Sequence, residues 1–385
     1  MLPGIRLTDI ITYDSIMEYF AIKVMYMKAD NLRVSERSSY WDNMKGVLIA
    51  LVVFGHCLYN VTDNSFISQL VNAIYFFHIP AFVFVSGFFS KSENSRSARS
   101  LVRLLSAYIL LNGVHLLMVL SAGHSLSITV PYYSSWYLLA LIVWRLITPY
   151  FSRTKWSLAL FVAISLLAGL WTDIGNQFAL SRIISLYPFF LAGFFLSKES
   201  AAKLISISAI KKIPLGFLCF GASAAAAFFA TKLLHIERKD LMFIAYNRSI
   251  KLQAAGRISI FIIASVCILG LMLVMPKRNI PLLTKAGRNS LAIFLIHRPI
   301  IIVADRFVGG LSTQMLLLYA AAFTIIACLV LGSDFVTRLL DKVLSFFTGI
   351  ILDIGDKNRA LWQKLLVVAI LLLLLSLPLV KIILF

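Results

Sequence analysis

The sequence is dominated by apolar stretches about as long as a membrane-spanning helix, separated by polar connections. A hydrocarbon core of about 30 Å requires about 20 residues of α-helix. Eleven stretches approach that length, and we predict about ten or eleven spans. They are residues 46–62, 70–89, 104–122, 133–151, 156–172, 180–197, 213–231, 258–275, 289–305, 312–331 and 365–385. They do not alternate apolar and polar residues as membrane barrel strands do, so we predict an all-α polytopic membrane bundle.

The composition supports this class. Of the 385 residues, 60% are hydrophobic and 14% are charged, whereas soluble domains are about 45–50% apolar and about 25% charged. This balance excludes a water-soluble fold, a disordered chain, a collagen-like repeat and a disulfide scaffold. The four cysteines lie inside apolar stretches without metal-ligand spacing, so we interpret them as small core residues and predict no metal site.

We predict three regions along the chain. Residues 1–43 form a cytoplasmic N-terminal tail with an amphipathic segment, and they lack the pattern of a cleaved signal peptide. Residues 44–331 form the main transmembrane domain, without an internal repeat or a low-complexity linker. Residues 332–385 form a cytoplasmic segment followed by a final transmembrane helix.

Basic residues determine the predicted orientation. The formal net charge is +19, but these residues lie between apolar stretches, so we interpret most of them as positive-inside anchors and predict no nucleic-acid partner. With the N-terminus in the cytoplasm, the first three outer connections, near 60–69, 123–131 and 173–181, contain no Lys or Arg. One connection, 232–257, is basic although it is predicted to be outside. Either the span count is off by one there, or this connection handles an anionic acceptor or a lipid phosphate; we favour the second.

The most informative spacing joins Lys45 to His56. Eleven steps of 100° bring the two residues to within about 20° of the same helix face, roughly 16 Å apart along the axis. We therefore expect Lys45 at the cytoplasmic interface and His56 about halfway through the bilayer. An ionisable side chain at that depth normally faces the bundle interior or a wet cavity, and histidine suits a general base. The alternative is a neutral histidine that bonds to a neighbouring helix.

Four stretches resemble motifs of the membrane acyltransferase-3 family of integral O-acyltransferases. Lys45, ten residues and His56 resemble its Arg/Lys-x10-His signature, and residues 41–56 are most similar to its fucose 4-O-acetylase-like branch. Residues 76–89, 135–138 and 287–299 resemble motifs of its second, fourth and late helices. The motifs occur in the family's order between about 41 and 300, and no resemblance extends beyond about 310.

The resemblance implies transfer of an acyl group, usually acetyl from cytoplasmic acetyl-CoA, to a hydroxyl of an extracytoplasmic polysaccharide or lipid-linked glycan. It implies a bacterial cytoplasmic (inner) membrane location, His56 as the essential histidine and Lys45 as its cationic partner. Arg96 and Arg99 match the spacing of the family's Arg-x-x-Arg feature, and Arg103 falls where its second arginine often lies. We expect these three arginines to bind the phosphates of acyl-CoA. Alternatively, any one of them is only a positive-inside anchor.

Four further side chains belong to the predicted site. Asp42 shares a helix face with Lys45, and we favour an ion pair over a helix cap and count it in the catalytic set. His78, Trp136 and Tyr137 are predicted to bind the acceptor. Packing is the alternative for His78, and interfacial anchoring is the alternative for the two aromatic residues.

Three other polar residues within the spans carry less weight. His297 is a weaker candidate than His78, and His115 and Arg145 are assigned no role.

We predict direct attack of the acceptor hydroxyl on the thioester, with His56 as general base; an acetyl-histidine intermediate is the alternative. The sequence has no Walker-type loop, HExxH or GxSxG motif, so ATP-driven transport, zinc proteolysis and α/β-hydrolase chemistry lack support. A glycan-precursor transporter or flippase and a membrane structural subunit remain as alternatives.

Overall fold

The computed structural model describes residues 38–60, 65–123, 127, 129–170, 177–234 and 250–354. These residues form helices and connections and contain no strand, which confirms the predicted all-α class. The contacts divide the chain into Met1–Ser39 and Tyr40–Phe385, and the fold below is that of the second unit. The predicted N-terminal tail up to residue 37 and the predicted final span lie outside the described residues, and the three-region division stays a prediction.

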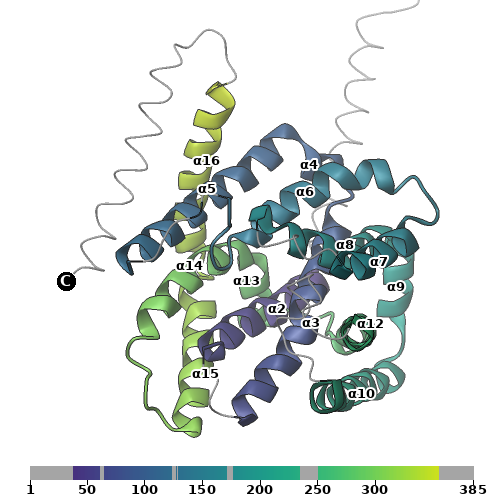
Figure 1. The fold of residues 1–385 in the computed structure, drawn as a ribbon. Coiled ribbons are helices and arrows are strands. Elements are labelled where there is room, and N and C mark those ends of the chain that lie inside the picture. Colours follow the sequence, from purple (N-terminus) through teal and green to yellow (C-terminus); the bar gives the residue numbers. More distant parts are fainter. Residues whose placement is uncertain are drawn as a thin grey trace, which may run out of the picture. The chain divides into compact units, whose positions relative to one another are not determined.

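The helices follow one another along the chain with short connections. In order they are α2 (Ser39–Leu58), α3 (Ser65–Phe89), α4 (Glu93–Arg96), α5 (Ala98–Ser121), α6 (Trp136–Phe151), α7 (Ser157–Leu167), η2 (Ala168–Leu170), η3 (Gln177–Ala179), α8 (Leu180–Phe195), α9 (Lys198–Ser206), α10 (Ala209–Leu234), α12 (Ile250–Val274), α13 (Pro281–Arg288), α14 (Ser290–Ala304), α15 (Thr313–Val330) and α16 (Asp334–Ile354). Figure 1 shows α10 beside α12 and α16 beside α5.

The protein is an integral membrane protein whose described part holds fewer full-length spans than predicted. Seven described helices are long and apolar enough to cross a membrane, or eight if α13 and α14, bent by 84°, form one span. Each predicted stretch before residue 332 coincides with a helix, but α6 and α7 are short. α6 begins only at Trp136, because Tyr133 has a left-handed φ of 47°. α7 ends in the 3-10 turn η2.

The interior forms around α2 and α3. Tyr40 donates to the carbonyl of Met272 in α12 at 2.6 Å, and Trp41 stacks on Phe88 of α3 with ring centroids 4.2 Å apart. α3 and α8 touch through Gly87 and Gly193, where a Cβ atom would collide with a backbone carbonyl of the opposite helix. Small residues allow this close approach of membrane helices. The four cysteines, Cys57, Cys219, Cys267 and Cys328, are all buried, as predicted.

The segment after residue 332 begins with a helix that packs on α5. Arg103 of α5 pairs with Asp341 of α16 at 2.5 Å, and the hydroxyls of Ser106 and Thr348 lie 3.3 Å apart. The opposite side of α16 leaves large apolar side chains exposed, among them Phe335 and Phe346. This helix is therefore amphipathic.

Candidate active site

A cavity of about 310 Å³ lies at the C-terminal end of α2. α3, α14, the connection before α6 and the first turns of α6 and α8 complete its wall. The lining residues are Val52, His56, Tyr59, Tyr75, Ile79, Phe82, Val130, Pro131, Tyr132, Tyr133, Ser134, Trp136, Tyr137, Arg182, Phe294 and Arg298. The predicted residues His56, Trp136 and Tyr137 are thus brought together. α2 ends at Leu58, so His56 lies in the last turn of its helix; its predicted depth in the bilayer stays a prediction.

His56 is held by a second histidine. Nδ1 of His297 lies 2.9 Å from the carbonyl oxygen of Ile293, one turn earlier in α14. A carbonyl oxygen only accepts, so Nδ1 of His297 carries the proton and Nε2 of the neutral ring is an acceptor. Nδ1 of His56 lies 2.9 Å from that Nε2 and therefore donates to it.

The hydrogen-bond chain leaves the other ring nitrogen of His56, Nε2, with its lone pair in the neutral state. Within the described part of the chain, no group bonds to this atom. The rings of His56 and His297 are stacked, 5.1 Å between centroids and 6° between planes, and His297 is fully buried. The arrangement is that of a general base whose tautomer is determined by its neighbour.

Two arginines face the same cavity. Arg298 follows His297 and donates to the carbonyl oxygen of His56 at 3.4 Å, which satisfies one of the last carbonyls of α2. Its guanidinium also lies 5.4 Å from the Tyr133 ring centroid. Arg182, in the first turn of α8, lies 5.2 Å from the ring of Trp136. Each guanidinium carries five N–H donors, so both arginines keep donor capacity beyond these contacts.

Hydrogen bonds hold the connection that forms one wall of the cavity. The side-chain oxygen of Asn112 accepts from the backbone N–H of Tyr132 at 2.9 Å and from the hydroxyl of Ser135 at 2.8 Å. Nδ1 of His115 donates to the carbonyl oxygen of Tyr132 at 3.1 Å. These bonds support Tyr133 in its left-handed conformation, which is unfavourable for a side chain of this size. His115, to which the sequence analysis assigned no role, supports the wall.

The two predicted aromatic residues lie in the wall as a pair. Trp136 and Tyr137 have ring centroids 5.8 Å apart in an edge arrangement, and both are nearly buried. The hydroxyls of Tyr137 and Ser86 in α3 lie 2.6 Å apart. This contact gives the hydroxyl of Ser86 a polar partner.

Asp42 and Lys45 form the predicted ion pair, at 2.7 Å, but they lie near the start of α2 and His56 lies near its end. Arg288 of α13 approaches the second carboxylate oxygen at 4.0 Å. Asp42 is only 2% exposed, and a buried carboxylate requires such partners. Neither Asp42 nor Lys45 lines the cavity. Their predicted place in the catalytic set stays a prediction, and the structure separates them from His56 by most of the helix.

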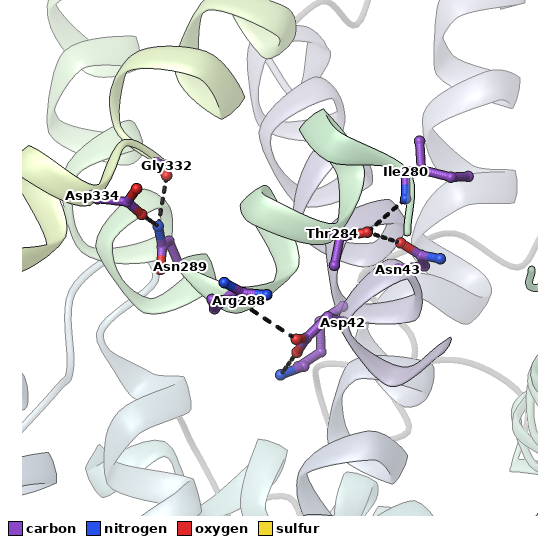
Figure 2. Close-up of polar contacts among 9 residues, drawn as sticks. Asp42, Asn43, Ile280, Thr284, Arg288, Asn289, Gly332 and Asp334 are labelled. Atoms are coloured by element: carbon purple, nitrogen blue, oxygen red, sulfur yellow. Dashed lines mark hydrogen bonds and ion pairs between the residues drawn. The ribbon is translucent and has the colours of Figure 1, made fainter. Parts of the chain in front are cut away.

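The same end of α2 is connected to α13 by polar contacts (Figure 2). Thr284 donates to the side-chain oxygen of Asn43 at 2.6 Å and accepts from the backbone N–H of Ile280 at 2.9 Å. At the bend between α13 and α14, Asn289 donates to the carbonyl oxygen of Gly332 at 2.8 Å. The bend is therefore bonded from both sides, which orients α14 and the histidine that it carries.

The three predicted donor-binding arginines lie near the start of α5. Arg96 ends α4 and is half-buried, Arg99 is exposed, and Arg103 is engaged with Asp341. Arg145, which had no assigned role, donates to the hydroxyl of Ser90 at 3.2 Å and to the carbonyl oxygen of Ser95 at 3.0 Å. It thereby connects α6 to the segment that carries Arg96.

His78 does not line the cavity. It is fully buried, and its Nδ1 donates to the carbonyl oxygen of Ile74 at 2.7 Å. This is the packing alternative weighed for this residue, and the geometry gives no support to acceptor binding. Within the basic connection 232–257, residues 235–249 lie outside the described residues. Arg257 is buried and donates to the carbonyl oxygen of Ser165 in α7 at 3.0 Å.

The comparison with protein families decides the class. The family described as "Acyltransferase domain" (acyltransferase 3) matches residues 38–333, more than half of the chain. The chain belongs to the acyltransferase 3 family. It is therefore a membrane acyltransferase, and the family implies an acyl donor and an acceptor.

Two curated relatives share a shorter stretch with this acyltransferase. "Nodulation protein NolL" of Sinorhizobium fredii is 35% identical over 86 residues, which cover 21% of this chain and 24% of the relative. "Nodulation protein NolL" of Mesorhizobium japonicum is 37% identical over 68 residues, which cover 17% of this chain and 18% of the relative. The chain thus spans a quarter or less of these relatives in the matched regions. No solved structure matches it.

Three residues of this acyltransferase were underrated from the sequence: two line the cavity, and the third, His297, lies buried behind His56. His297 was placed below His78, although it bonds directly to His56. Arg298 was quoted only within a motif, and Arg182 was not singled out. Each lies in a predicted span, and an ionisable residue within a span is itself a signal of function.

Proposed function

We propose that this acyltransferase moves an acetyl group from cytoplasmic acetyl-CoA to a hydroxyl of an extracytoplasmic polysaccharide or lipid-linked glycan, in a bacterial cytoplasmic membrane. The observation that carries the proposal is the His56–His297 pair, at 2.9 Å, beside a cavity with aromatic walls. The pair supplies a base, and the cavity offers rings on which a sugar can pack. The similarity to two nodulation proteins supports it only distantly.

In the proposed reaction, Nε2 of His56 accepts the proton of the acceptor hydroxyl as its oxygen attacks the thioester carbonyl. The carbon–sulfur bond then breaks, and the proton on His56 passes to the leaving thiolate, giving the acetyl ester and free CoA. His297 is a positioning residue, because it accepts the Nδ1 proton of His56 and holds the ring. Arg298 lies beside His56, and its N–H donors suit the negative charge that develops on the attacked carbonyl oxygen.

The donor is proposed to enter from the end of α2 that carries Lys45. Lys45, Arg288 and the arginines near the start of α5 are cations that suit the phosphates of CoA. The cavity with His56 lies at the opposite end. A thioester on the pantetheine arm would have to extend along α2 to reach the base, roughly 16 Å from Lys45.

The test uses strains that express wild-type protein, the His56→Ala variant or the Arg306→Gln variant at equal membrane abundance. Arg306 is exposed and outside the cavity, so it is the matched control. Mass spectrometry of surface glycans is expected to show loss of acetyl groups with His56→Ala, normal glycan export, and no change with Arg306→Gln. Lost export with intact acetylation would instead indicate a glycan transporter. Unchanged glycans would exclude a chemical role for His56.

A further inference from the structure

We propose that the acceptor is anionic: Arg182 binds a carboxylate or phosphate group of the glycan while its sugar ring packs on the aromatic wall of the cavity. That the ligand is the acceptor rests on the proposed function, but the anion site itself is tested by binding alone. The proposal assigns a negative charge to the ligand and makes Arg182 a residue that determines specificity.

The charge of the cavity wall supports an anion. Among the residues that the structure describes, the charged side chains of this wall are Arg182 and Arg298, and no Asp or Glu lines the cavity. In the part of the chain that the structure describes, neither arginine forms an ion pair within 4.0 Å. Asp305 lies in the neighbourhood of Arg298, but it accepts from Asn60 at 2.7 Å. A cavity with two cations and no carboxylate attracts a negative ligand.

Arg182 is the more specific of the two arginines. Arg298 is engaged with the end of α2, whereas the guanidinium of Arg182 lies over the ring of Trp136. Its Nε is buried and, among the described residues, has no hydrogen-bond partner. The terminal nitrogens of the same guanidinium face the cavity, and no described residue bonds to them. A guanidinium without an acceptor is costly, and a ligand oxygen in the cavity can form a charge-assisted hydrogen bond with these terminal N–H groups.

The backbone around Arg182 is built to hold it there. Phe178 and Ala179, just before α8, both have left-handed φ angles, 50° and 56°. The backbone N–H of Phe178 donates to the carbonyl oxygen of Thr129 at 2.6 Å, which connects this turn to the cavity wall that contains Tyr133. Strained backbone is retained where the surrounding structure requires it, commonly at ligand sites.

The position of the cavity assigns the anion to the acceptor and not to CoA. Arg182 lines the same cavity as His56, at the end of α2 opposite Lys45. The proposed phosphate-binding residues of the donor lie at that other end. Tyr59 and Tyr133, which are 37% and 41% exposed, bring the cavity to the surface at the His56 end. An anionic sugar entering there meets Arg182 and Trp136 together.

The experiment measures equilibrium binding to the purified full-length protein in detergent. The probes are labelled matched sets: glucose, galactose and mannose, the uronic acid of each, and the 1-phosphate of each. We expect at least one anionic member to bind about tenfold or more tightly than its neutral partner, the effect of one charge-assisted hydrogen bond. Preference for the uronic acid or for the phosphate identifies the source of the anion.

Arg182→Gln is expected to remove this preference, so that each anionic sugar binds no more tightly than its neutral partner. Arg182→Lys is expected to retain part of it, and Arg306→Gln all of it. Equal binding of every anionic and neutral pair, or a preference that survives Arg182→Gln, overturns the inference. So does weaker CoA binding by Arg182→Gln with sugar binding unchanged. An Arg182-dependent preference in a protein that transfers no acetyl group would support the anion site and contradict the proposed function.

Discussion

At the scale of single residues, the site depends on which nitrogen of each histidine carries a proton. The carbonyl oxygen of Ile293 requires a proton on Nδ1 of His297, and this in turn directs the Nδ1 proton of His56 toward His297. The chemistry of His56 therefore depends on a neighbour 241 positions away in sequence. A base with the wrong tautomer is present but inactive.

This dependence predicts the effect of changing His297. His297→Ala is expected to lower kcat for acetyl transfer by at least about tenfold with little change in KM, because the base loses its orientation and not its substrate contacts. His297→Gln is expected to retain more activity, since its amide oxygen can accept from His56. The measurement is the initial rate of CoA release with acceptor present.

A purely structural role for His297 would give a different pattern. Both variants would then lose activity in proportion to the amount of folded protein, measured by size-exclusion chromatography. Equal kcat values for His297→Ala and wild-type protein would contradict the proposed positioning of His56 by His297.

At the scale of helices, the contact between α2 and α13 fixes the position of the Asp42–Lys45 pair relative to the His56–His297 pair. The backbone of α13 approaches α2 so closely that only glycine fits at 287, where a Cβ atom would lie 2.7 Å from the backbone nitrogen of Gly46 and would collide with the carbonyl oxygen of Asp42. α13 also leads through the 84° bend into α14, which carries His297. A shift of α13 would therefore displace both the Asp42–Lys45 pair and the His56–His297 pair.

We predict that Gly287→Ala destabilises the protein by about 1–3 kcal/mol, the usual cost of overpacking. The matched control is Gly113→Ala in α5, where a Cβ atom meets nothing within 4 Å. There the helix is expected to gain about 0.5–1 kcal/mol. Thermal unfolding in detergent measures both. A lower unfolding midpoint for Gly113→Ala than for Gly287→Ala would show that the close contact of α13 with α2 does not require glycine at position 287.

At the scale of the whole molecule, local features were predictable and the assembly of the site was not. The Lys45–His56 spacing and the Asp42–Lys45 pair follow from helix geometry, and the structure has the pair at 2.7 Å. The partnership of His56 with His297 and the grouping of Arg182 with Trp136 join helices distant in sequence. Periodicity contains no information about such packing. Hydropathy also overestimated the lengths of helices α6 and α7, because α6 begins only after the left-handed Tyr133 and α7 gives way to the 3-10 turn η2.

Because the two proposed binding regions lie at opposite ends of α2, we also predict that a substitution at one end changes the KM for only one of the two substrates. Arg103 is at the proposed donor end, yet its guanidinium pairs with Asp341 of α16. If Arg103 binds the phosphates of acetyl-CoA, Arg103→Gln raises the KM for acetyl-CoA by about tenfold. Asp341→Asn, which releases the same arginine, leaves that KM unchanged or lowers it. Because the pair is half exposed, each variant changes the free energy of unfolding by only about 0–1 kcal/mol.

The two variants together distinguish ligand binding from a structural contact between α5 and α16. Initial rates of CoA release at varied acetyl-CoA and fixed acceptor give the KM, and Trp136→Ala, in the cavity wall, is the reference for a change at the other end. Trp136→Ala is expected to raise the KM for the acceptor and to leave the KM for acetyl-CoA unaltered, because the two substrates meet only at His56. An equal rise in the KM for acetyl-CoA with Arg103→Gln and Asp341→Asn would mean that Arg103 acts by holding α16, and the donor phosphates would then have to bind elsewhere.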